Sequence, residues 1–73
     1  MEKKFSEMKY GEKGVVKRIE KGFQEKIAGM GIRVGKKVEM LTREPLRGPV
    51  VVIVDESRTS LGLGMAKKIT VEV

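Results

Sequence analysis

Side chains that could perform catalysis or bind a metal ion are scarce in this sequence. The 73 residues include no cysteine and no histidine. Ser–His and Cys–His nucleophile pairs and a histidine general base are therefore excluded, and a structural zinc site is not expected. The adjacent acidic residues Asp55 and Glu56 favour a turn between two strands, because a hard-cation site needs several converging carboxylates. We expect no enzyme activity, no bound metal and no cofactor.

The basic residues indicate binding rather than catalysis. Lysine and arginine number 16 against 10 acidic residues, which gives a formal net charge of +6. Such a balance favours a nucleic acid, an anionic membrane surface or an acidic protein as the partner. Small basic barrels bind RNA or single-stranded DNA by stacking bases on aromatic side chains, but the only aromatic residues here are Phe5, Tyr10 and Phe23. A barrel that binds RNA or single-stranded DNA stays as the alternative to a protein-binding domain.

No segment of the sequence has the apolar length of a membrane span. The first six residues are not followed by the apolar stretch of a signal peptide. The longest apolar run, 50–54, is far shorter than the roughly 20 residues that a spanning helix needs. The lack of cysteine also fits a reducing compartment. We therefore expect a cytoplasmic protein that meets a membrane only through a partner.

Nine glycines and two prolines divide the chain into short pieces, which is typical of a small barrel or sandwich. Residues 1–14 are interpreted as a polar lead-in. Strands are predicted at 15–20, 37–43, 50–54, 58–63 and 69–73. A helix is predicted over 22–30 and a 3₁₀ turn over 64–68. The predicted fold class is mainly β, a small barrel of about five strands with one short α-helix, in which closure removes exposed strand edges.

The spacing of apolar residues assigns faces to the strands. Val15 and Ile19 are predicted to share one face of the first strand, with Lys17 between them. The strand 50–54 is apolar at every position. That continuous run predicts a central strand covered on both sides.

The helix has one apolar stripe. Phe23, Ile27 and Met30 fall on the same side at helical spacing. The stripe could bind a partner, but in so short a chain we interpret it as a cover over the core. Gly31 is predicted to be the left-handed residue that ends the helix.

The order and spacing of glycine, proline and aliphatic residues along the chain resemble those of the FeoA family. Members of this family are small cytosolic accessory proteins of bacterial ferrous iron transport. Near the start, the matching residues are Gly11, Gly14, Val15 and Ile19. Around the helix and its exit, they are Lys26, Ile27, Met30, Gly31, Ile32, Gly35 and Val38. In the middle loop and the strand after it, they are Pro45, Leu46, Gly48, Pro49 and Val50. Near the end, they are Leu61, Ala66, Ile69 and Val71. Val34 departs from the family, many members of which have proline before the turn glycine.

The resemblance implies an SH3-like barrel that occupies residues 1–73 as a single domain. It also implies a partner, the cytosolic nucleotide-binding region of the membrane iron transporter FeoB. The same fold occurs as the C-terminal domain of iron-dependent repressors, so the fold alone does not decide function. Because histidine and cysteine are absent, the chain lacks the usual iron ligands. We expect it to act in iron uptake by protein–protein contact, without holding iron itself.

The predicted partner-binding surface combines a proline loop with the outer side of the helix. Leu46 is an apolar loop residue beside Pro45, and Arg47 can form forked hydrogen bonds to a carboxylate. Gln24 and Lys26 on the helix would extend the surface. The alternative is that Leu46 folds onto the end of the barrel while Arg47 is only solvated. A weak homo-oligomer paired through an edge strand also stays open.

Overall fold

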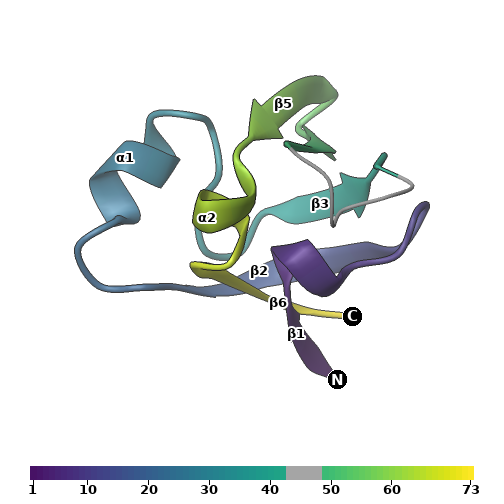
Figure 1. Cartoon of the computed structure of the whole chain (residues 1–73), viewed down its shortest axis with the longest axis horizontal. Helices are drawn as coiled ribbons and strands as arrows, with labels where there is room; N and C mark the ends of the chain where they lie inside the picture. Colours follow the sequence, from purple (N-terminus) through teal and green to yellow (C-terminus); the bar gives the residue numbers. More distant parts are fainter. Residues whose placement is uncertain (43–48) are drawn as a thin grey trace.

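The computed structural model describes residues 1–42 and 49–73 (Figure 1). Within these ranges lie six β-strands, two short α-helices and one 3₁₀-helix. In chain order they are β1 (Glu2–Lys4), η1 (Phe5–Glu7), β2 (Lys13–Ile19), α1 (Gln24–Ala28), β3 (Lys37–Met40), β4 (Val50–Val54), β5 (Ser57–Leu61), α2 (Leu63–Ala66) and β6 (Ile69–Glu72).

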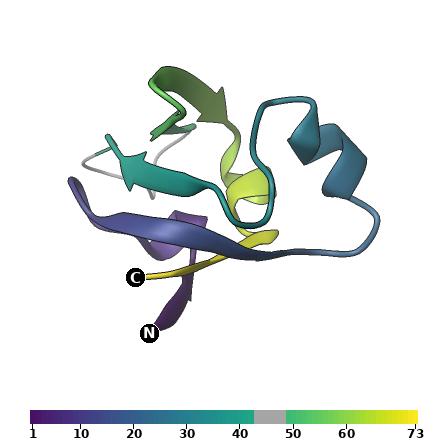
Figure 2. The same cartoon turned by 180° about the vertical axis from the view of Figure 1, so that it is seen from behind.

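The strands form one sheet in the order β1-β6-β2-β3-β4-β5. Each neighbouring pair is antiparallel. Figures 1 and 2 show the sheet strongly curled, with α1 at one side and η1 near α2. The last strand, β6, lies between β1 and β2, so the first and last parts of the chain meet in the sheet. The mainly-β fold class predicted from the sequence is confirmed. The expected closure that would remove both strand edges is wrong, because β1 and β5 lie at the two ends of the sheet and do not pair with each other.

Residues 1–14 contain more structure than a polar lead-in. β1 pairs with β6, with Lys3 opposite Val71. The turn of η1 places the Phe5 side chain fully inside the core, and Met8 is also fully buried. The sequence pattern hides β1 because all three of its residues are charged. The sheet therefore has six strands, one more than the sequence predicted.

A β-bulge in β2 changes which residues face the core. Val16 and Ile19 are buried, whereas Val15 is 38% exposed. The pairing of β2 with β6 shifts register between Val16 and Arg18. The extra residue of a bulge brings residues three apart onto the same face. The prediction that Val15 and Ile19 share a face is therefore wrong.

β4 is a central strand, as predicted, but only one of its faces is fully covered. Val50, Val52 and Val54 are buried, while Val51 and Ile53 are half-buried. The continuous apolar run therefore marks a strand whose outer face is partly open to solvent.

The turn predicted at Asp55 and Glu56 is confirmed and joins β4 to β5. Val54 pairs with Ser57, which leaves two residues in the turn. Asp55 has φ 50° and Glu56 has φ 67°. Positive φ at both central residues is the type I′ conformation, whose twist suits a hairpin. This turn fixes which backbone groups of β5 face β4.

The segment 64–68, predicted as a 3₁₀ turn, instead carries the short α-helix α2. The N–H of Ala66 donates to the carbonyl of Gly62 at 2.9 Å, and the N–H of Lys67 donates to the carbonyl of Leu63 at 3.1 Å. Both bonds span four residues, as in an α-helix. β5 accordingly ends before this helix and does not run to residue 63.

α1 ends in a Schellman motif, which confirms the predicted cap at Gly31. The N–H of Gly31 donates to the carbonyl of Ala28 at 2.9 Å, and the N–H of Ile32 donates to the carbonyl of Ile27 at 3.4 Å. Gly31 has φ +85°, a conformation that glycine adopts without steric cost. Ile27 and Ile32 are both fully buried, so the cap ties the end of the helix to the core.

Proline at position 34 is expected to stabilise the protein. The N–H of Lys36 donates to the carbonyl of Arg33 at 3.1 Å, and Gly35 has φ +94°. These are features of a type II turn, whose second residue favours proline. Val34 occupies that place, is 61% exposed, and its N–H makes no hydrogen bond within residues 1–42 and 49–73.

In urea unfolding, Val34→Pro should raise the free energy of unfolding by about 0.4–1 kcal/mol, because proline restricts the unfolded chain. Val34→Ala is the control, since it removes the same side chain but leaves the backbone free. A proline variant less stable than the alanine variant would show that the turn has another conformation.

Candidate partner-binding surface

The helix residues predicted to contact a partner lie on an accessible element. Gln24 and Lys26 both belong to α1 and both are exposed. Figures 1 and 2 show α1 at the side of the sheet away from both chain ends. The structure therefore presents this part of the predicted surface to solvent.

The opposite side of α1 is fixed to the core. Ile27 is fully buried, and Phe23 and Met30 pack partly buried against the core cluster. The interpretation of this stripe as a cover over the core is confirmed. Beside it, the Lys68 ammonium lies 5.0 Å from the centroid of the Phe23 ring, a cation–π distance. The same Lys68 Nζ lies 2.9 Å from a carboxylate oxygen of Glu20. These contacts join the start of α1 to the segment that precedes β6.

The two residues of α1 predicted to contact a partner, Gln24 and Lys26, differ in how free their side chains are. The Gln24 side-chain amide donates to the backbone carbonyl of Ile19 at 3.4 Å. Part of Gln24 thus ties α1 to the end of β2. Lys26 takes part in none of the ion pairs found within the described residues. Of the two, Lys26 is the better candidate for contact with an acidic partner.

The loop residues of the predicted surface, Pro45, Leu46 and Arg47, lie outside the described residues. The structure does describe the chain on both sides of that segment. The N–H of Leu41 donates to the carbonyl of Val51 at 2.8 Å. The N–H of Val51 donates to the hydroxyl of Thr42 at 2.6 Å. The association of the loop with α1 stays a prediction.

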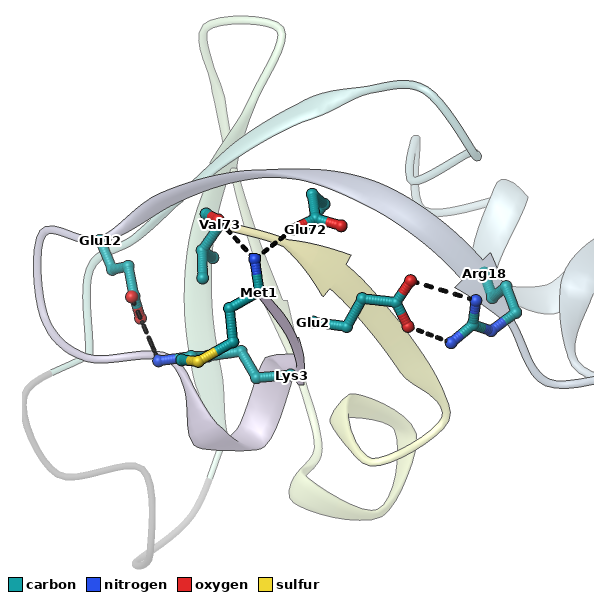
Figure 3. Close-up of polar contacts among 7 residues, drawn as sticks. All are labelled: Met1, Glu2, Lys3, Glu12, Arg18, Glu72 and Val73. Carbon is teal, nitrogen blue, oxygen red and sulfur yellow. Dashed lines mark hydrogen bonds and ion pairs between the residues drawn. The ribbon is translucent and has the colours of Figure 1, made fainter.

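Charged contacts hold the edge strand β1 and the residue before it against the rest of the domain (Figure 3). The Met1 ammonium contacts the Glu72 carboxylate and the Val73 carbonyl oxygen, Arg18 contacts Glu2, and Lys3 contacts Glu12. The carboxylates of Glu2, Glu12 and Glu72 are therefore each engaged with a cation of the chain itself.

These contacts shift the ionisation of two carboxyl groups. The Arg18 guanidinium lowers the pKa of Glu2, and Glu2 in turn raises the pKa of Arg18. The backbone N–H of Lys9, followed by the Lys3 ammonium, lowers the pKa of Glu12. A lowered carboxyl pKa in the folded state adds stability above the unfolded pKa, and that stability is lost as the pH falls through the folded pKa. Screening by water keeps such contributions small at exposed groups.

A shallow groove on the outer face of the sheet is the feature that sequence reasoning missed. It lies over β2 and β3, and its apolar lining includes Val15, Ile53 and Val73. Lysine and glutamate side chains of both signs surround it. The sequence interpretation placed Val15 on the same face as Ile19, which is buried, so it could not find this surface. The register shift in β2 is the structural reason for the exposure of Val15.

The described part of the chain contains neither a cluster of metal-ligating side chains nor a helix that could span a membrane. No group of three or more acidic side chains within residues 1–42 and 49–73 could hold a metal ion. No helix in these ranges is long and apolar enough to cross a bilayer.

The family model of the FeoA domain matches residues 3–73. The chain therefore belongs to the FeoA domain family. It is 35% identical over 66 residues to a protein of Methanocaldococcus jannaschii provisionally named Fe(2+) transport protein A. That alignment covers 88% of this chain and 78% of the relative.

Solved structures show the same fold. The crystal structure of an iron uptake regulatory protein, FeoA, has a TM-score of 0.91 and 32% identity, covering 99% of this chain and 97% of that one. The NMR structure of a FeoA-like protein from Clostridium acetobutylicum has a TM-score of 0.84 and 28% identity, covering 99% of this chain and 86% of that one. The fold is accordingly SH3-like, as the resemblance implied.

A different kind of protein contains the fold as one part. A manganese-dependent transcriptional repressor matches with a TM-score of 0.85 and 25% identity, over 96% of this chain but only 40% of its own. Since one fold serves proteins with different tasks, function has to be argued from surfaces.

Proposed function

We propose that this protein is a non-enzymatic accessory of ferrous iron uptake that acts through contact with the cytosolic nucleotide-binding region of a FeoB-type transporter. The observation that carries the proposal is the match of the FeoA domain model to residues 3–73. The relative named for Fe(2+) transport and the structure named as an iron uptake regulatory protein support it. In this role the protein is cytoplasmic and reaches the membrane through its partner.

The chemistry of the chain supports a role without bound iron. Its sequence has no histidine or cysteine, which are common ligands for ferrous iron. The carboxylates of Glu2, Glu12 and Glu72 are each engaged with a cation of the chain itself. Protein contact is then the route by which the domain would influence transport.

We place the contact on the exposed side of α1, together with the loop residues Pro45, Leu46 and Arg47. Lys26 supplies an exposed positive charge, and Ile27 fixes the helix that carries it. A helix already fixed in the free protein loses little conformational freedom on binding. An acidic patch on the transporter is the expected counterpart.

Replacing Lys26 with glutamate is expected to weaken binding to the cytosolic region of the transporter. Reversing a charge that faces an acidic patch should raise the dissociation constant about fivefold to tenfold, mainly through slower association. Calorimetric titration at two salt concentrations gives the measurement. Lys17→Glu is the matched control, because Lys17 is also exposed but belongs to β2.

The two possible failures of this experiment have different meanings. If the unmodified chain does not bind the transporter region at any salt concentration, the proposed function is wrong. If Lys17→Glu weakens binding as much as Lys26→Glu, the function stands but its location on α1 does not.

Nucleic-acid binding is the second candidate, and its support is the charge of +6. Stacking platforms need several exposed aromatic rings, but Phe5 is fully buried and Phe23 packs partly buried against the core, which leaves Tyr10 as a single exposed ring. We expect no detectable binding of RNA or single-stranded DNA even at about 50 mM salt, where phosphate contacts are strong. Binding that falls steeply as salt rises would favour this candidate instead.

A further inference from the structure

One edge of the sheet is protected against pairing with a further strand, and the other edge is open. Its order begins with β1 and ends with β5. β1 has only three residues, all charged, and Glu2 and Lys3 are each held in an ion pair. Short, charged strands are a usual protection against the addition of a further strand. The β1 edge has that protection.

β5 lacks these protective features. It has five residues, of which Arg58 alone is charged, and no proline. Ser57, Arg58 and Ser60 are exposed and Thr59 is half-buried. Figure 1 shows β5 at the top of the molecule, with β4 beside it and no further strand beyond it.

The turn before β5 determines which backbone groups point away from the sheet. Because a two-residue turn joins Val54 to Ser57, these two form a hydrogen-bonded pair, and such pairs alternate along an antiparallel ladder. Thr59 and Leu61 therefore also bond to β4. The N–H and C=O groups of Arg58 and Ser60 point outward.

An independent contact agrees with this alternation. The carbonyl of Val51 accepts from Leu41, and its N–H donates to Thr42. The backbone of Val51 thus faces the β3 side, which leaves Val50 and Val52 to face β5. No hydrogen bond from residues 1–42 or 49–73 reaches the outward groups of Arg58 and Ser60.

We propose that the open edge of β5 accepts an extended acidic segment of a partner protein as an additional antiparallel strand. The four outward backbone groups of Arg58 and Ser60 supply the hydrogen bonds. Main-chain pairing of this kind gives affinity, and side chains on alternate residues give specificity. β5 contains Arg58 and no acidic residue among Ser57–Leu61. Arg58 therefore favours a partner segment that has an acidic residue directly across from it or diagonal to it.

A second copy of this chain is a less suitable occupant than an acidic segment. Two molecules that each carry a charge of +6 repel one another. Pairing β5 with itself would also bury only a short polar edge, much less than a stable dimer interface needs. An acidic segment would be attracted instead of repelled, since its charge is opposite to that of the chain.

The inference rests on the proposed function in one respect, because both proposals require the chain to be a protein-binding domain. It concerns a different surface from α1. It is tested with peptides and without the transporter, so the two proposals fail separately.

Amide NMR titration of the whole chain provides the test. The probe is a short capped peptide of alternating valine and glutamate, and the control is the same peptide with lysine in place of glutamate. The glutamate peptide should shift the amides of Arg58 and Ser60 and slow their hydrogen exchange. The lysine peptide should bind at least about fivefold more weakly, given the energies of cross-strand charge pairs.

Two substitutions locate the site. Ser60→Pro removes an outward N–H without removing a bond to β4, and it should weaken binding at least about tenfold. Ser60→Ala retains the N–H and should bind like the unmodified chain. Arg58→Glu should reverse the preference, so that the lysine peptide binds better than the glutamate peptide.

An N-methylated glutamate peptide keeps the test valid if the proline variant does not fold. Methylation of the amides that would face β5 should abolish the shifts in the unmodified chain. The proposal is overturned if the methylated peptide binds equally well, or if the shifts centre on α1. It is also overturned if the Arg58 and Ser60 amides shift with protein concentration alone, since a second copy would then occupy the edge.

Discussion

Replacing Gly14 with alanine is expected to lower the free energy of unfolding by about 1–3 kcal/mol, the usual cost of inserting atoms into a packed site. A Cβ atom at Gly14 would lie 2.8 Å from the backbone oxygen of Glu72 and 2.9 Å from Cγ1 of Val73. The first of these neighbours is backbone of the segment next to β2. It cannot move aside without disturbing the pairing of β2 with β6.

The control for Gly14→Ala is the same substitution in α2. A Cβ atom at Gly64 meets no other atom within 4 Å, and alanine favours a helix relative to glycine by about 0.5–1 kcal/mol. Gly64→Ala should therefore leave stability unchanged or raise it. Urea unfolding of both variants gives the comparison. If the two substitutions had equal effects, the close approach of β2 and β6 at Gly14 would not be a constraint on the fold.

Truncating Ile27 to alanine is expected to cost about 2–5 kcal/mol, the range for large-to-small changes at fully buried positions. Ile27 is fully buried, and its carbonyl also accepts the closing bond of the helix cap from Ile32. A domain of this size has a total stability of only about 5–15 kcal/mol. The alanine variant should therefore unfold at much lower urea concentration and lose the protection of the α1 amides.

Two further variants make the Ile27 experiment decisive. Ile27→Val removes one methyl group and should cost about 0.5–1.5 kcal/mol. It remains measurable even if the alanine variant does not fold. Lys26→Ala, at the exposed neighbouring position, should change stability by no more than about 0.5 kcal/mol. If Lys26→Ala were as damaging as Ile27→Ala, the interpretation of α1 as a cover fixed by its apolar side would be wrong.

Features that depend on local chemistry could be predicted from the sequence. The hairpin at Asp55 and Glu56 follows from an acidic pair between two strand-like runs. The helix cap follows from Gly31 directly after an apolar stripe. Both are decided by residues close together in the chain, which is where sequence patterns are informative.

Features that depend on pairing between distant segments could not be predicted. β1 consists of three charged residues and becomes a strand only because β6 lies beside it. The bulge after Val16 is likewise a property of the β2–β6 ladder. No spacing of apolar residues reveals a register shift before the partner strand is known. The prediction that Val15 and Ile19 share a face was wrong for this reason.

The candidate site was only partly accessible to sequence reasoning. Lys26 is exposed on α1 as predicted, whereas Gln24 also donates a hydrogen bond to Ile19. The open edge of β5 has no sequence signature, because Arg58 and Ser60 become outward residues only through the register that the preceding turn sets. Resemblance to the FeoA family indicated a protein partner, and only the sheet order shows where a strand could be added.

The place of β6 in the sheet has a consequence for how the chain folds during synthesis. β6 is made after β1 and β2, yet it lies between them. Until Ile69–Glu72 leaves the ribosome, β2 has no paired strand on that edge, and β1 has no paired strand at all. Pairings between such distant segments also slow folding, because a long loop must close before they form. The nascent chain is therefore expected to stay open until β6 has been made, with its core residues available to chaperones.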